Sequence, residues 1–182
     1  MEKTDYEKSL ENYTYNDGKH IFDRIKNSDG LDDRENSDIL NAIVLWKINR
    51  IPYVSAETMR KVRKLPVKTT DDLRPNKKQI KECVMELLGS KGIQLPMAST
   101  ILRFFYPDAF LIFDQRAYRE VYKTEEPTFY GKDANEKYYK VYMDYIEKCV
   151  EYQKEHCPNV KFRDLDKAFY QADKDKNNRV KY

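Results

Sequence analysis

Apolar residues at helical spacing constrain this fold more than any other feature of the sequence. In successive segments the apolar side chains recur three or four positions apart, as on one face of an amphipathic helix, and proline, glycine or a capping residue bounds each segment. No run longer than a few residues alternates apolar and polar positions, the pattern typical of a half-buried strand. The sequence therefore predicts an all-α fold, a compact bundle of about six helices.

Capping residues and prolines place these helices along the chain. Ser37 and Ser55 are candidate N-caps, and Pro52 ends the helix that precedes it. Pro96 occupies a favoured first position, and Asp114 opens a short helix further on. Helices are expected over residues 37–49, 55–65, 75–88, 95–105, 115–122 and 134–156, and from residue 162 onward.

The same pattern divides the chain into three parts. Residues 1–36 form a polar N-terminal arm, mostly extended with a short helix near residues 20–25; residues 37–175 form a single helical domain; residues 176–182 form a frayed tail. The N-terminus lacks the apolar core of a signal peptide, and no apolar stretch approaches the ~20 residues of a membrane helix. A soluble cytoplasmic protein that does not contact membranes is the expectation.

Composition argues against several classes of site. The chain has 5 glycines and neither a Rossmann nor a P-loop signature, which disfavours the common nucleotide-binding folds. It has 2 histidines and 3 widely spaced cysteines, with no cysteine pair at the spacing of metal ligands. No metal and no cofactor are therefore expected, and the cysteines are predicted to be ordinary thiols.

Charge is unevenly distributed along the chain. The whole sequence has a net charge of only +3, but residues 47–81 hold eleven basic residues against three acidic ones. Lys47, Arg50, Arg63 and Lys64 belong to this basic stretch, and an acidic cluster over residues 29–38 precedes it. A solvated helix face accounts for such a surplus, and so does a surface that releases counterions from DNA phosphates.

The turn over residues 91–95 joins two predicted helices. It contains Lys91, Gly92, Ile93 and Gln94, and it is short enough that the two helices pack against each other. Such a turn directs backbone N–H groups and the positive end of the second helix at one point, which suits a DNA phosphate. An ordinary helix–helix turn is the alternative.

Residues 91–118 resemble the hairpin and catalytic-aspartate region of the helix-hairpin-helix DNA glycosylase superfamily. Gly92 and Ile93 match the first Gly and Val of its L-x-G-V-G-x-x-x-A motif, and Ala98 matches its small residue. Asp114 stands 22 residues after Gly92, the offset typical of that family.

Other motifs resemble those of small bacterial proteins with a glycosylase-like fold. These are a Trp-Lys-x-x-Arg helix end, a D-x-R-x-W/Y step and a late R-x-L-D-x-A-L segment. The matching residues are Trp46, Lys47 and Arg50; Asp114, Arg116 and Tyr118; and Arg163, Leu165, Asp166, Ala168 and Phe169.

The resemblance implies a DNA-binding, monofunctional N-glycosylase of the base-excision-repair type, nucleoid-associated within the cytoplasm. Asp114 would stabilise the oxocarbenium-like transition state or activate water, after the base has been flipped out of the duplex. Residues 91–94 and Arg116 would contact phosphates, and Trp46 and Tyr118 would stack on the base. Two departures stand out: Gln94 replaces the second glycine, and Pro96 stands where bifunctional members carry a Schiff-base lysine, so lyase chemistry by that route is not expected.

Each of these residues also has a purely structural interpretation. Asp114 is a good N-cap for the helix it precedes, Arg116 can form an internal ion pair, and aromatic residues at helical spacing are typical of a core. A second class of function is therefore a non-catalytic helix-hairpin-helix module that binds nucleic acid or protein. A domain that binds a small molecule or a protein partner is a third.

Overall fold

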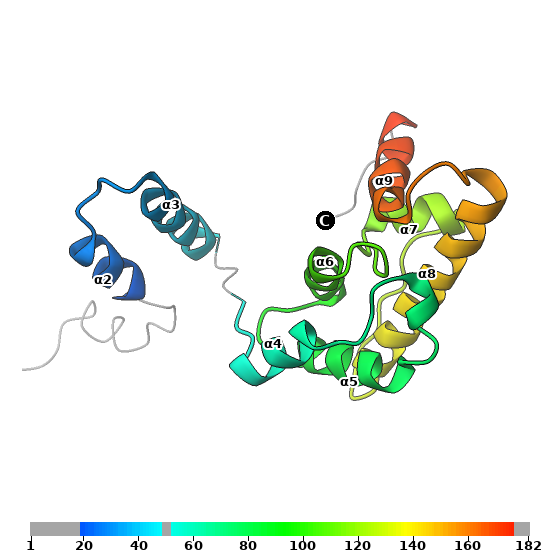
Figure 1. The fold of residues 1–182 in the computed structure, drawn as a ribbon, viewed down its shortest axis with the longest axis horizontal. Coiled ribbons are helices and arrows are strands. Elements are labelled where there is room, and N and C mark those ends of the chain that lie inside the picture. The colour runs from blue at the N-terminus through cyan, green and yellow to red at the C-terminus, as the bar shows by residue number, and fades with distance from the viewer. Residues whose placement is uncertain (1–18, 49–51, 177–182) are drawn as a thin grey trace, which may run out of the picture. The chain divides into compact units, whose positions relative to one another are not determined.

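The computed structural model describes residues 19–48 and 52–176, most of which are in helices (Figure 1). Within these ranges there are eight α-helices, two short 3-10 helices and no β-strand, which confirms an all-α protein but exceeds the expected six helices. The helices are α2 Lys19–Asn27, α3 Asp33–Lys47, α4 Ala56–Arg63, η1 Thr70–Asp72, α5 Lys77–Leu88, α6 Leu95–Phe105, α7 Gln115–Tyr122, α8 Ala134–His156, η2 Phe162–Asp164 and α9 Leu165–Asp175.

The chain divides into two compact units, Met1–Ile51 and Pro52–Tyr182. This boundary differs from the expected one after residue 36, because α3 begins at Asp33 and belongs to the same unit as α2. Asp32, rather than Ser37, caps α3 by accepting hydrogen bonds from the Arg34 and Glu35 backbone N–H groups. The short helix expected near residues 20–25 is α2, and α3 begins within the expected arm. Residues 1–18 and 177–182 lie outside the described ranges.

Helices α2 and α3 form a hairpin with a well-defined turn. The Ser28 hydroxyl donates to the Glu35 carboxylate at 2.9 Å, and the Asn36 side chain donates to the Gly30 carbonyl at 2.8 Å. Gly30 has φ +76, in the left-handed region where glycine has no Cβ penalty. Ile21 and Ile39 are buried, one from each helix.

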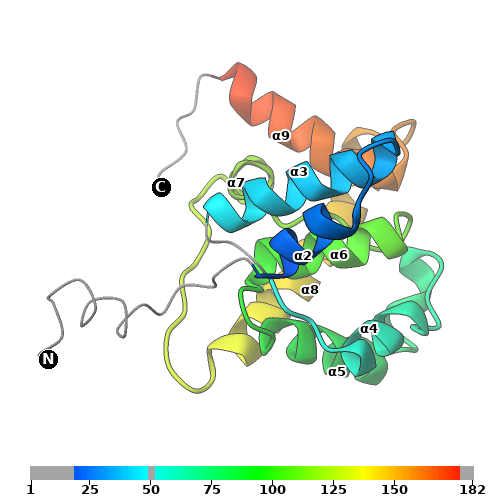
Figure 2. The same cartoon turned by 90° about the vertical axis from the view of Figure 1, so that its left-hand side faces the viewer.

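The hydrophobic core of the second unit lies among helices α4, α5, α6 and α8, closed by the segments that follow α6 and by α9 (Figures 1 and 2). Helix α8 has 23 residues and is about 34 Å long at 1.5 Å per residue. The fully buried side chains include Val62, Ile80, Val84, Leu87, Leu102, Phe110, Leu111, Tyr142, Tyr145, Ile146 and Leu165.

Buried ion pairs attach α9 to α7. The Asp173 side chain is 1% exposed and accepts hydrogen bonds from Arg119 at 2.7 and 2.9 Å and from Arg116 at 3.1 Å. Glu120 is a buried carboxylate on α7, and it pairs with Lys123 at 2.9 Å and with Lys176, which follows α9, at 2.5 Å. Truncating Arg116 or Arg119 would leave the buried Asp173 carboxylate with fewer partners, which is costly. The Asp173 ion pairs therefore favour this packing of α9 on α7.

No helix in the described ranges is both long enough and apolar enough to cross a lipid bilayer.

Candidate functional site

A tight turn joins α5 to α6. The Ile93 backbone N–H donates to the Ser90 carbonyl at 3.2 Å, which closes a four-residue turn with Gly92 in its third position. Gly92 has φ +76, the conformation that a type II turn requires there and that favours glycine. Gly89, in contrast, has φ −80, so the left-handed glycine of this connection is Gly92 and not Gly89.

The turn alternates anchored and exposed residues. Ile93 and Leu95 are buried in the core, whereas Lys91, Gly92 and Gln94 are exposed. The Ile93 side chain is therefore a core anchor, and only the turn's exposed residues are available to a ligand.

Two further features define the outer surface of this turn. The Tyr53 backbone N–H donates to the Lys91 carbonyl at 2.9 Å, which fixes the turn to the segment before α4. Gln94 is the N-cap of α6, but its side chain makes no capping hydrogen bond. The start of α6 thus has no side-chain cap, and Pro96 at its second position has no backbone N–H.

Between α6 and α7 the chain crosses the core without forming a helix. Ala109, Phe110, Leu111 and Phe113 are all nearly inaccessible to solvent. Buried backbone groups that no helix or sheet pairs need other partners, because each unpaired group costs about 1–3 kcal/mol. The Ala109 and Phe110 N–H groups both donate to the Tyr106 carbonyl at 3.1 Å.

Side chains from three helices satisfy this buried backbone. From α8, Tyr142 donates its hydroxyl to the Leu111 carbonyl at 2.9 Å, and Tyr145 donates to the Ile112 carbonyl at 3.4 Å. Asp166 of α9 accepts from the Ile112 N–H at 3.2 Å, and Ser99 of α6 accepts from the Phe113 N–H at 2.9 Å.

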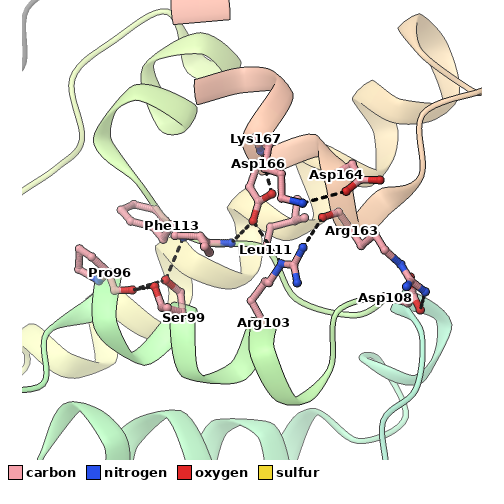
Figure 3. A network of polar contacts seen from close by, with 12 residues as sticks. Pro96, Ser99, Arg103, Asp108, Leu111, Phe113, Arg163, Asp164, Asp166 and Lys167 are labelled. Carbon is pink, nitrogen blue, oxygen red and sulfur yellow. Dashed lines mark hydrogen bonds and ion pairs between the residues drawn. The ribbon is translucent and has the colours of Figure 1, made fainter. Parts of the chain in front are cut away.

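Ser99 connects this segment to the beginning of α6 (Figure 3). Its hydroxyl donates to the carbonyl of Pro96, the second residue of α6, at 2.9 Å, while its oxygen accepts from Phe113. Phe113 immediately precedes Asp114. The structure therefore holds the start of α6, just after the exposed turn, close to the backbone that leads into Asp114.

Asp166 is the centre of a second set of contacts in Figure 3. Its side chain is 5% exposed and lies 3.6 Å from the Arg103 guanidinium, which also donates to the Arg163 carbonyl at 2.7 Å. Arg163 in turn pairs with Asp108. These contacts connect the far half of α6 to the start of α9.

Asp114 is half-buried and caps α7. Its carboxylate accepts from the Arg116 N–H at 2.8 Å and from the Ala117 N–H at 3.4 Å, which confirms the capping role predicted from the sequence. Burial raises the pKa of the half-buried Glu126 carboxyl, and the negative charge of Asp114 raises it further. The Glu126 carboxyl, on the segment that follows α7, is therefore close enough to interact electrostatically with Asp114.

Two of the predicted site residues, Tyr118 and Arg116, make their contacts within the folded chain. Tyr118 is buried and stacks on Tyr122 with ring centroids 4.4 Å apart, and burial raises the pKa of its hydroxyl. Arg116 pairs with the buried Asp173, and its guanidinium lies 5.5 Å from the Tyr170 ring centroid. Tyr118 is thus a core residue, and Arg116 takes part in the internal ion pair that the sequence allowed.

The basic residues of α4 lie away from the turn. Arg63 is exposed and lies over the ring of Phe105, at 5.3 Å from its centroid, and Lys64 follows as the exposed C-cap. Phe105 ends α6, about 15 Å along the helix axis from Leu95 at 1.5 Å per residue. Arg63 and Lys64 are consequently near the opposite end of α6 from the turn.

The remaining predicted residues belong to the N-terminal unit. Lys47 is exposed at the end of α3, and Trp46 beside it is half-buried. Arg50 lies outside the described residues.

Helical spacing placed Tyr142 in the core, but sequence reasoning gave no hydrogen-bonding role to Ser99, Tyr142 or Asp166. Asp166 stood in a matched motif, and that match was the only signal available for it. The second unit has one surface pocket between α4 and α5, which Lys64 helps to line, and another between α5 and α8; neither includes Asp114 or the turn.

Comparison of the chain with known protein families, with curated proteins and with solved structures found no match.

Ser99 and Thr100 provide a matched test of the segment before Asp114. Both hydroxyls donate to the Pro96 carbonyl, but only Ser99 also accepts from buried backbone. We expect Ser99→Ala to lower the free energy of unfolding by about 1–3 kcal/mol, because it leaves the Phe113 N–H unpaired. Thr100→Ala should change it by less than ~0.5 kcal/mol. Urea denaturation measures both, and equal effects of the two substitutions would contradict this role for Ser99.

Proposed function

We propose that this protein binds the phosphate backbone of DNA through the turn at the start of α6. The observation that carries the proposal is the Ser99 contact, which joins Pro96, just after the exposed glycine-containing turn, to Phe113, just before Asp114. Phosphate contacts position a protein on DNA, and a phosphate held at the turn would bring the adjoining nucleotide toward Asp114.

The start of α6 suits an anion. An 11-residue helix has a positive N-terminal end, and here the N-cap side chain does not occupy the first backbone N–H groups. Gly92 has no side chain to obstruct a phosphate, and Lys91 adds a positive charge on the exposed side of the turn. Gln94 has an amide that can donate a hydrogen bond to a phosphate oxygen, in place of the backbone approach that a second glycine would allow.

Arg63 and Lys64 extend the surface along α6. DNA rises 3.4 Å per base pair, so the ~15 Å between the turn and the Phe105 end of α6 corresponds to about four base pairs. A duplex lying along α6 would therefore have one backbone position at the turn and another near Arg63. Lys61 contributes less, because it pairs with Glu86, and this hydrogen bond raises the pKa of the lysine.

Lys91→Glu tests backbone binding directly. The substitution keeps the Tyr53 contact, which uses only the Lys91 backbone. We expect weaker binding to every DNA sequence and a slope of log K against log salt reduced by about one, because one phosphate contact is lost. Fluorescence-anisotropy titrations at several salt concentrations measure this.

Lys161→Glu is the matched control, because it makes the same charge change at an exposed residue outside the turn. Equal losses for the two variants would show that binding depends on net charge and would count against the turn.

Hydrolysis of an N-glycosidic bond is a second candidate function, favoured by the fixed position of Asp114. The segment that precedes Asp114 is hydrogen-bonded to three helices, so the carboxylate is held in place before any substrate binds. A carboxylate there would stabilise positive charge on the deoxyribose while the base departs and water adds to C1′. Glu126, whose pKa is raised, is the neighbouring group that could hold a proton.

Asp114→Asn separates catalysis from folding. Asparagine is as good an N-cap as aspartate, so α7 should remain intact and the free energy of unfolding should change little. If the protein is a glycosylase, wild type releases a free base from duplexes that carry damaged bases, and Asp114→Asn reduces the rate at least ~100-fold. Chromatography of the released base measures this rate.

The same assay distinguishes the two functions. DNA binding without base release from a broad panel of lesions would leave a non-catalytic binding module. Base release at an unchanged rate by Asp114→Asn would contradict the catalytic role of this carboxylate.

A further inference from the structure

The pocket between α5 and α8 is an elongated groove. Its volume is about 920 Å³, and residues 70–81 supply one wall and residues 136–154 the other, all within the second unit. On α8 the lining begins at Glu136 and ends at Lys154, about 27 Å further along the helix at 1.5 Å per residue. The length of the groove therefore suits an extended or helical segment better than a compact small molecule.

The floor of the groove is apolar. Leu73, Tyr139 and Ile146 are buried there. Met143 and Val150, two turns apart on α8, are half-buried and pack against the core. A helix that presents an apolar stripe can bury it against such a floor.

The two walls of the groove carry opposite charges. Arg74 and Lys77 line the wall at the start of α5, whereas Asp144, Glu147 and Glu151 line the wall on α8. All five side chains are exposed. Within the described ranges none of the five forms an ion pair, because the one pair in this groove joins Lys81 to Glu136 at 2.8 Å. The five charges therefore remain available to a partner.

A few charged residues depart from this division. Lys140 and Lys154 stand on either side of the three carboxylates along α8, and Asp71 precedes Arg74 on the other wall. Between Lys140 and Lys154, however, every charged residue that lines the α8 wall is acidic. The acidic stretch covers about two turns of the helix.

We propose that this groove binds a helix of a partner protein whose apolar stripe has basic residues along one flank and acidic residues along the other. The basic flank lies along the carboxylates of α8, the acidic flank lies beside Arg74 and Lys77, and the stripe packs on the apolar floor. A helix of about 18 residues spans the length of the groove.

The charges of the walls restrict which occupant fits and how. The three carboxylates on α8 repel nucleic-acid phosphates, so the groove is separate from the proposed DNA-binding turn. Turning a helix end for end exchanges its two flanks. A partner helix with one basic and one acidic flank therefore fits this groove in only one direction.

Two designed peptides test this recognition. Both are amphipathic helices of about 18 residues with the same composition and a leucine stripe. The first has Lys on one flank and Glu on the other; the second alternates Lys and Glu along both flanks. By fluorescence anisotropy with the full chain, we expect the first peptide to bind at least ~10-fold more tightly, because only its charges match both walls.

Glu147→Lys locates the contact. It should weaken binding of the first peptide about 5-fold, because it removes one attraction and introduces one repulsion. Glu155→Lys is the matched control: it makes the same change at an exposed residue of α8 outside the groove, and it should leave the affinity unchanged. Both residues are exposed, so circular dichroism should show an intact fold in each variant.

Several outcomes would overturn the proposal. Equal affinities for the two peptides, or no binding of either, would show that the groove does not recognise this charge arrangement. Equal losses in Glu147→Lys and Glu155→Lys would attribute binding to net charge. A wild-type chain that self-associates and becomes monomeric in Glu147→Lys, as measured by sedimentation velocity, would make a second copy of the chain the occupant instead.

Discussion

The buried backbone of residues 109–113 is the constraint on which the second unit depends. This segment crosses the core outside any helix, so its amide and carbonyl groups need partners that regular structure does not provide. The Ala109 and Phe110 N–H groups donate to the Tyr106 carbonyl. For residues 111–113 the partners are Ser99 of α6, Tyr142 and Tyr145 of α8, and Asp166 of α9. Because each unmade bond would cost about 1–3 kcal/mol, these four side chains fix how the three helices meet.

The candidate site is a consequence of that constraint. Ser99 hydrogen-bonds to both Pro96 and Phe113, so the start of α6 and the entry to α7 are held together. The turn that contains Gly92 precedes α6, and Asp114 is the N-cap of α7. Phosphate binding by the turn and chemistry at the carboxylate are proposals that rest on this geometry, and the first does not require the second.

Local patterns in the sequence were sufficient to predict much of this structure. Helical spacing identified α4 to α8, and the caps at Ser55 and Asp114 are where the sequence placed them. The start of α3 was missed because Asp32 and Ser37 are both good caps and only the hairpin contacts decide between them. The bonds to the buried segment could not be predicted, because their partners stand 14 to 54 residues apart and leave no periodic signal.

Amide hydrogen exchange at Ile112 and Phe113 tests the account most directly. Both N–H groups are outside helices, so slow exchange there can come only from the side-chain acceptors Asp166 and Ser99 and from burial. We expect protection comparable to that of the core amides of α8, such as Ile146. Exchange as fast as that of the exposed loop residue Thr124 would contradict it.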